Sequence, residues 1–142
     1  MEQLKKRIES NKNNFDIEGI TLLGGEPVLQ AQGLAELARF AHSIDLSVML
    51  FTGYKLKELD DSRFVGVDRL LSHVDVVVDG EFELDIVERN RNWVGSTNQM
   101  FHYLTNRYDS SIESMSDLIT NEWRVNTQGQ VSINGLPFIV KA

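Results

Sequence analysis

The sequence predicts an α/β fold built on a parallel sheet or a piece of a barrel, and three short apolar runs are the main evidence. These runs begin at Ile20, Val48 and Val74, so that successive runs start 28 and 26 residues apart. A strand–helix–strand unit with parallel strands takes roughly 30 residues, which matches this spacing. Each run ends in glycine or a polar residue, and helical patterns lie between the runs. This alternation is typical of α/β proteins, in which helices cover the faces of a parallel sheet.

The first part of the chain predicts two helices with one strand between them. Residues 1–14 place Leu4 and Ile8 on one face of a helix, with basic side chains around them. The apolar residues 20–23 then predict a strand that ends at two glycines. A second helix is predicted next, because apolar residues recur at positions i, i+3, i+4 and i+7, the spacing of one helical face. These residues are Leu34, Leu37, Ala38 and Ala41.

The second apolar run, residues 48–51, and the third, Val74 followed by Val76-Val77-Val78, predict two further strands of the same sheet. Helical stretches are expected around residues 56–59 and 67–71, between these strands. No linker or low-complexity segment divides the chain, so residues 1–142 are expected to form one domain.

The end of the chain predicts a β-hairpin. Residues 123–126 and 130–133 read as strands, and the segment between them, Thr127-Gln128-Gly129, has the composition of a turn. Asn134-Gly135 is a second turn signal, and the apolar residues 137–140 follow it.

The composition excludes several classes of function. Fourteen basic residues stand against twenty-one acidic residues, which gives a net charge of −7. Nucleic acids and anionic membrane surfaces need a basic face, so neither is an expected partner. No apolar run approaches the roughly 18 residues of a membrane span. Because the N-terminal segment also lacks the apolar core of a secretory signal, we expect a cytoplasmic protein.

The chain contains no cysteine, which excludes a disulfide framework, a thiolate zinc site and an iron–sulfur cluster held by its own thiolates. His42, His73 and His102 are far apart and show no metal-ligand spacing, so structural or surface roles are expected for them and no metal site is predicted. Trp93 and Trp123 are expected to anchor the core, because no basic and aromatic residues interleave around them.

Glycine and acidic or polar residues follow all three predicted strands. In parallel α/β proteins ligands bind at the carboxyl ends of the strands, where glycine lets a ligand approach the backbone. The acidic side chains suit an ammonium group or sugar hydroxyls better than a phosphate. A purely structural interpretation is equally open, since glycine also makes tight turns and acidic residues also cap helices. The strand ends are Gly24-Gly25-Glu26-Pro27, Thr52-Gly53-Tyr54 and Asp79-Gly80-Glu81.

Four motifs resemble, in order, those of radical S-adenosylmethionine (SAM) activating enzymes. The family includes the activating proteins of anaerobic ribonucleotide reductase and of pyruvate formate-lyase, and the resemblance covers about residues 18–100. Residues 101–142 would then be a C-terminal extension that carries the hairpin. The motifs are GGEP at residues 24–27, FTGY at 51–54, VDVVVDGEF at 74–82 and WVGSTNQ at 93–99.

This resemblance implies a partial (βα)6 barrel that binds SAM and a [4Fe-4S] cluster. Such enzymes take an electron from a reductant such as flavodoxin or ferredoxin and install a glycyl radical on a partner enzyme. The family's GGEP strand end contacts the methionine ammonium of SAM, which assigns cofactor binding to Gly24, Gly25 and Glu26. By position on neighbouring strand ends, the resemblance extends the SAM site to Thr52, Gly53, Asp79, Gly80 and Glu81.

The sequence departs from the family in one respect, because the CxxxCxxC loop that precedes the GGEP strand is missing. We expect that these 142 residues alone do not cleave SAM reductively, and no catalytic residue is assigned. The chain is interpreted as a fragment that lacks the first βα unit, whose loss leaves a sheet edge open to self-association. Two alternatives stay open, a cluster-less relative and an interaction module in which the strand-end turns are only structural.

Overall fold

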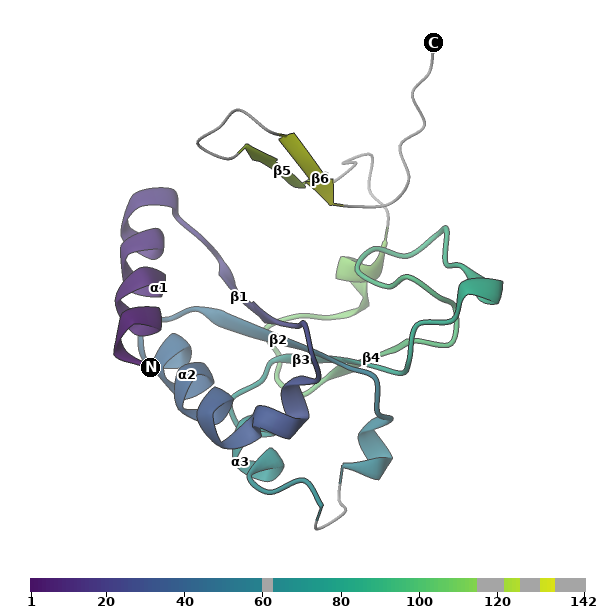
Figure 1. Ribbon diagram of the computed structural model, residues 1–142, viewed down its shortest axis with the longest axis horizontal. Helices are drawn as coiled ribbons and strands as arrows, with labels where there is room; N and C mark the ends of the chain where they lie inside the picture. Colours follow the sequence, from purple (N-terminus) through teal and green to yellow (C-terminus); the bar gives the residue numbers. More distant parts are fainter. Residues whose placement is uncertain (60–62, 115–121, 126–130, 135–142) are drawn as a thin grey trace.

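The computed structural model describes residues 1–59, 63–114, 122–125 and 131–134. Four strands form one open sheet in the order β1-β2-β3-β4 (Figure 1). Strands β1 to β3 are parallel, as the three apolar runs predict. The described strands form an open sheet, so the partial barrel stays a prediction. The strands are β1 (Gly19–Leu22), β2 (Ser47–Thr52), β3 (Val76–Asp79) and β4 (Met100–Tyr103).

The expectation of an all-parallel sheet is wrong at β4, which pairs with β3 in the antiparallel direction. The sequence pattern does not predict this strand. Its four residues, Met100 to Tyr103, are exposed or half-buried, because β4 lies at the edge of the sheet. It therefore lacks the continuous apolar run that marks a strand covered on both faces.

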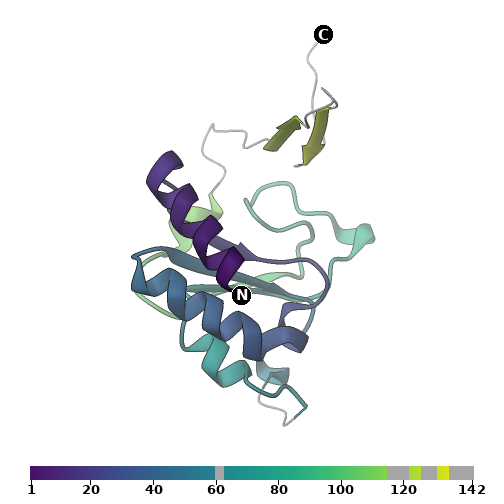
Figure 2. The ribbon, with the colours of Figure 1, turned by 60° about the vertical axis from the view of Figure 1, so that its left-hand side comes forward.

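Two of the described α-helices, α2 and α3, pack side by side on one face of the sheet, and α1 packs against α2 (Figures 1 and 2). Short 3₁₀ turns connect the other elements, and one of them replaces the helix predicted at residues 56–59. The α-helices are α1 (Glu2–Phe15), α2 (Ala31–Ser43) and α3 (Val67–Leu71). The 3₁₀ turns are η1 (Pro27–Gln30), η2 (Leu56–Glu58), η3 (Leu84–Ile86) and η4 (Ser110–Glu113). No helix in the described ranges is long and apolar enough to cross a membrane.

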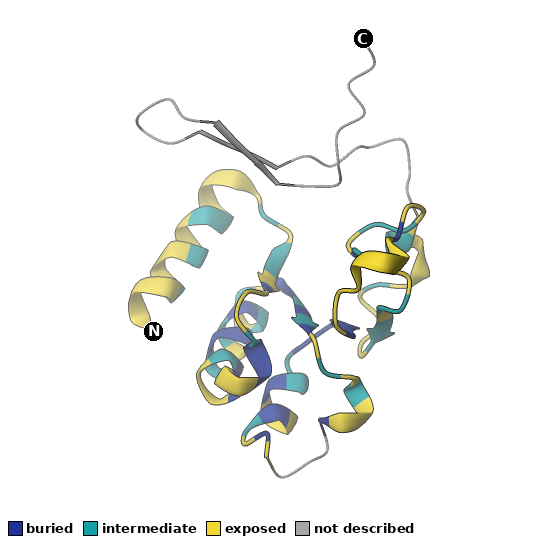
Figure 3. Ribbon diagram, turned by 45° about the vertical axis from the view of Figure 1, so that its right-hand side comes forward, coloured by how far each residue is buried: buried dark blue, intermediate teal, exposed yellow. Residues whose placement is uncertain are grey.

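The core lies between α2, α3 and the sheet, where the buried residues concentrate (Figure 3). Small alanines at positions 35, 38 and 41 are fully buried and let α2 approach β2 closely. Val48 and Leu50 of β2 are also fully buried beneath this helix. In contrast, no residue of α1 is buried, so its contribution to the core is small.

Strand β1 is an edge strand, because β2 is its only hydrogen-bonded neighbour among the described residues. The strand starts at Gly19, where any Cβ atom would collide with Ser47 on β2, so the close pairing of β1 and β2 requires glycine there. Within the described ranges no strand pairs with the other backbone edge of β1, and self-association through this edge stays a prediction.

The predicted hairpin is confirmed in its two strands. Strand β5 (Glu122–Val125) pairs in the antiparallel direction with β6 (Val131–Asn134), and Trp123 lies opposite Ile133. Together they form a separate two-stranded sheet. The expected turn at residues 127–129 and the run at 137–140 lie outside the described residues, as does Gly135 of the second turn signal.

Candidate functional site at the carboxyl edge of the sheet

The parallel strands bring most of the predicted site to one edge of the sheet. Thr52, the last residue of β2, lies opposite Asp79, the last residue of β3. Glu26 follows β1 and makes hydrogen bonds to both Thr52 and Gly53. The three strand ends that sequence analysis selected are therefore neighbours in space.

The Glu26 carboxylate ties the ends of β1 and β2 together. Its Oε1 accepts hydrogen bonds from the Thr52 hydroxyl at 2.8 Å and from the Val28 backbone N–H at 3.2 Å. Its Oε2 accepts one from the exposed Gly53 N–H at 2.9 Å. Because a carboxylate offers about four acceptor positions, Oε2 retains capacity for a cationic ligand. Glu26 thus serves the fold and still presents negative charge at this edge.

Gly24 and Gly25 form an exposed turn directly before Glu26. Their φ angles of 88° and 56° lie in the left-handed region, which favours glycine, so the structural interpretation of these glycines holds. No atom lies within 4 Å of the position that a Cβ on Gly24 would take. A ligand therefore has open access to the backbone at this turn.

Asp79 is buried and holds the neighbouring loop in place. Its Oδ2 accepts a hydrogen bond from the Leu56 backbone N–H at 2.7 Å, which fixes the start of η2 to the end of β3. The Nε2 atom of His102 lies 2.9 Å from the same oxygen, within ion-pair distance but without the alignment of a hydrogen bond. Asp79 contributes to the site through this positioning of its neighbours.

Two buried polar atoms near the end of β3 have no hydrogen-bond partner in the described part of the chain. They are Asn98 Oδ1, beside Gly80, and His102 Nε2, beside Asp79. Asn98 packs close to Gly80, whose φ of 102° requires glycine, and its Nδ2 donates to the Glu81 carbonyl at 2.7 Å. Buried polar atoms are rarely left without a partner, so this place suits a polar ligand group.

Asn98 and His102 are not among the site residues that the sequence predicts. Asn98 belongs to the WVGSTNQ motif, which was a signal for it, whereas His102 lies on the unpredicted strand β4 opposite Val77. The Glu81 side chain is exposed and forms no hydrogen bond or ion pair with another described residue, whereas its carbonyl accepts the bond from Asn98.

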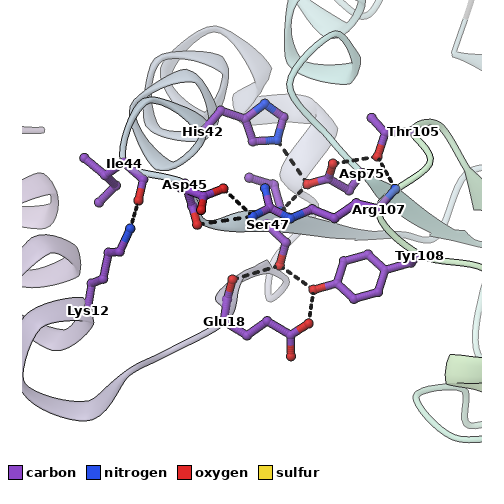
Figure 4. A network of polar contacts seen from close by, with 11 residues as sticks. Lys12, Glu18, His42, Ile44, Asp45, Ser47, Asp75, Thr105, Arg107 and Tyr108 are labelled. Atoms are coloured by element: carbon purple, nitrogen blue, oxygen red, sulfur yellow. Dashed lines mark hydrogen bonds and ion pairs between the residues drawn. The ribbon is translucent and has the colours of Figure 1, made fainter.

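A second polar network lies at the opposite, amino-terminal edge of the sheet (Figure 4). Asp75 accepts hydrogen bonds from Val48 N–H at 2.8 Å, His42 Nε2 at 3.0 Å and the Thr105 hydroxyl at 2.7 Å. Burial raises the pKa of Asp75, but the bonds from Thr105, Val48 and His42 outweigh it and leave the pKa below its ordinary value.

The same network fastens the segment after β4 to the other strands. Arg107 pairs with Asp45 at 2.6 Å, and the Tyr108 hydroxyl donates to Glu18 at 2.6 Å and contacts Ser47 at 2.8 Å. All these side chains are occupied by one another, so the network stabilises the fold. The structural role expected for His42 agrees with this arrangement.

The donor set does not fit an iron–sulfur cluster bound by thiolates, because the sequence has no cysteine. Within the described ranges, no group of three or more histidine and acidic side chains is arranged to hold a metal ion. The chemistry that these residues themselves support is the binding of a small polar ligand with a cationic group.

The fold is that of a mixed α/β protein with polar and acidic groups gathered at the carboxyl ends of its parallel strands, and comparison with known proteins gives its family. Residues 1–102 match the family model described as "4Fe-4S single cluster domain". The chain therefore belongs to this family and groups with the anaerobic ribonucleoside-triphosphate reductase-activating proteins, as its four motifs predict.

Three relatives illustrate the similarity, and all carry the name anaerobic ribonucleoside-triphosphate reductase-activating protein. The Vibrio cholerae protein is 36% identical over 92 residues, which are 61% of this chain and 56% of that protein. The Escherichia coli K12 protein is 32% identical over 99 residues, 66% of this chain and 61% of that protein. The Salmonella typhimurium protein is 31% identical over 109 residues, 72% of this chain and 68% of that protein.

The chain thus spans about three fifths of the length of the first two of these relatives. No solved structure matches it.

Proposed function

We propose that this chain takes part in activating an anaerobic ribonucleoside-triphosphate reductase and that it binds SAM at the carboxyl edge of the sheet. The observation that carries the proposal is the Glu26 carboxylate, held between two strand ends with acceptor capacity left on Oε2. The relatives support the choice of partner, because each is named as an activating protein of that reductase.

In this proposal the methionine ammonium of SAM binds next to Glu26 Oε2. The exposed backbone of Gly24 and Gly25 leaves room for the ligand on one side. Thr52 and Gly53 orient the carboxylate, and a charge-assisted hydrogen bond from an ammonium to a carboxylate is roughly twice as strong as a neutral one. Polar groups of SAM away from its methionine ammonium would bind beside Gly80 and Asn98.

The cluster requires thiolates that these 142 residues do not contain. We propose that cysteines outside this sequence supply them and that the whole activase forms the partial (βα)6 barrel. In that barrel a further strand would pair with the free edge of β1. A reductant such as flavodoxin or ferredoxin and a glycyl radical on the partner belong to this proposal, as does a cytoplasmic location, because oxygen destroys the chemistry of the family.

The absence of cysteine also favours a second candidate, a cluster-less relative that acts as a binding module. In that case Glu26 would serve only the fold. The module would bind its partner without SAM, and substitution of Glu26 would leave partner binding unchanged.

Isothermal titration of the purified chain with SAM tests the proposal. We expect measurable affinity that Glu26→Gln abolishes, whereas Glu9→Gln on the exposed face of α1 changes nothing. A thermal melt of each variant shows whether the protein is still folded. SAM binding of equal strength after Glu26→Gln contradicts the site assignment, and no binding by the unmodified chain favours the binding module.

A further inference from the structure

Two stretches of chain after β3 pair as an antiparallel ribbon that carries several exposed apolar side chains. Residues 82–88 and 93–97 run antiparallel, joined by hydrogen bonds from Thr97 N–H to the Ile86 carbonyl at 2.8 Å and from Glu88 N–H to the Gly95 carbonyl at 3.0 Å. We call these two stretches the 82–97 ribbon, and part of it is visible as an exposed segment in Figure 3. Its exposed apolar side chains are Phe82 (52%), Leu84 (78%), Ile86 (39%), Val87 (40%) and Trp93 (56%).

The ribbon is held in place by buried polar groups. Ser96 is fully buried, and its hydroxyl accepts a hydrogen bond from Glu83 N–H at 3.1 Å. The Gln99 Oε1 atom accepts from Gly95 N–H at 2.8 Å and from Ser96 N–H at 3.2 Å. Glu88 is also buried and pairs with Arg91 at 2.7 Å. These hydrogen bonds and this ion pair hold the backbone of the ribbon, and its exposed apolar side chains project from it into solvent.

Phe82 and Trp93 are both positioned in an unusual way. The Phe82 ring lies so close to Gly95 that an added Cβ atom would stand 2.8 Å from its Cδ2, yet the ring stays half-exposed. Trp93 adopts a φ of 70°, which is unfavourable for a residue with a Cβ atom. Its exposure contradicts the prediction that it anchors the core. Backbone strain of this kind concentrates at functional surfaces.

Acidic side chains alternate with the apolar ones here: Glu81, directly before the ribbon, and Glu83 and Asp85 in its first stretch are all exposed. None of these three carboxylates forms an ion pair or hydrogen bond with other described residues. The nearby Arg91 is already paired with Glu88 and Glu113. The ribbon therefore combines apolar contact area with negative charge that is left for a partner.

We infer that the 82–97 ribbon is a protein-docking surface whose partner presents apolar side chains flanked by lysine or arginine. Complementary charge steers such partners together and rejects others. A second copy of this chain fits poorly, because a symmetric contact would place the same acidic patch on both sides. The inference rests on the proposed function for the identity of the partner, which is the reductase.

Biolayer interferometry under anaerobic conditions tests the inference, with the full chain and the anaerobic ribonucleoside-triphosphate reductase from the same organism. Leu84→Ser and Trp93→Gly remove exposed apolar side chains of the ribbon, and Glu83→Lys reverses one of its charges. Glycine at position 93 also suits the left-handed backbone there. Matched controls are Phe15→Ser, at an apolar residue 73% exposed on α1, and Glu9→Lys. We expect ribbon variants to bind at least about tenfold more weakly and the controls to bind as the unmodified chain does.

Salt and oligomeric state separate the remaining outcomes. Binding by the unmodified chain should weaken as ionic strength rises, and Glu83→Lys should reduce that dependence. Unchanged binding by all three ribbon variants overturns the docking surface and leaves the proposed function intact. No binding by the unmodified chain overturns both. A dimer in light scattering that Trp93→Gly dissociates would make a second copy the occupant and also overturn the inference.

Discussion

Glu26 and Thr52 are 26 residues apart in the chain, and a hydrogen bond of 2.8 Å between their side chains fastens the end of β1 to the end of β2. Thr52 is buried, and its hydroxyl also accepts a bond from the Tyr54 backbone N–H at 3.2 Å. The pair therefore links the stability of the sheet edge to the orientation of the carboxylate that we assign to ligand binding.

Replacing Thr52 by valine should weaken both properties, because it keeps the branched shape and removes the hydroxyl. We expect the free energy of unfolding to fall by about 1 to 2 kcal/mol, the usual cost of losing a buried hydrogen-bond partner. Urea unfolding checks this, with Thr21→Val on the exposed face of β1 as the control. SAM affinity should fall in parallel and recover in Thr52→Ser. A Thr52→Val protein as stable as the unmodified chain would show that the bond contributes nothing.

Gly95→Ala should destabilise the 82–97 ribbon, because the new methyl group would stand 2.8 Å and 2.9 Å from two ring carbons of Phe82. Because the half-exposed ring of Phe82 can move aside, the cost should lie at the low end of the about 1 to 3 kcal/mol that overpacking takes in a core. The cost should largely disappear when Phe82→Ala is combined with it, so a double-mutant cycle by urea unfolding should show strong coupling.

A second glycine provides the control for that experiment. Gly33 lies inside α2, and the nearest atom to an added Cβ there is 3.9 Å away. Gly33→Ala should therefore stabilise the protein by about 0.5 to 1 kcal/mol, since alanine favours helix. Additive effects of Gly95→Ala and Phe82→Ala would refute the contact between them.

Stability should fall in acid partly because of Glu88. Hydrogen bonds from the Asn90 backbone, the Arg91 side chain and the Arg89 backbone lower the pKa of Glu88 from 4.5 to about 2. A carboxyl whose pKa is lower in the folded state stabilises the fold above its unfolded pKa. That contribution is lost as the pH falls from about 4.5 towards 2. Urea unfolding over this pH range should show a smaller slope for Glu88→Gln than for Glu9→Gln, and identical slopes would contradict the assignment.

These 142 residues should not produce 5′-deoxyadenosine from SAM, even with dithionite as a strong reductant. The reason is chemical, because no thiolate is present to bind a cluster. Chromatography of an anaerobic reaction mixture checks the prediction, and a longer protein that carries the cysteines serves as the positive control. Detection of 5′-deoxyadenosine from this chain alone would mean that the cluster is held in another way.

Strand pairing inside the parallel sheet was predictable from local patterns. Runs starting at Ile20, Val48 and Val74 are rich in apolar residues, and their spacing leaves room for one crossover each. The pattern is strongest in β3, where every residue is buried, and weaker in the edge strand β1, where Thr21 is exposed. Parallel strands connected in this way end at the same edge, so the gathering of Glu26, Thr52 and the β3 end followed from the order of elements.

Only the tertiary structure revealed how far those side chains are already engaged. Asp79 accepts a hydrogen bond from the Leu56 backbone and lies beside His102. His102 belongs to the half-buried edge strand β4, which no apolar run in the sequence predicts. Trp93 has the large apolar side chain of a core anchor, yet in the antiparallel ribbon its φ is 70° and its side chain is exposed. Local periodicity determined which residues form the buried strands. Contacts between residues distant in sequence depend on register and on the direction in which the chain returns, which no local pattern records.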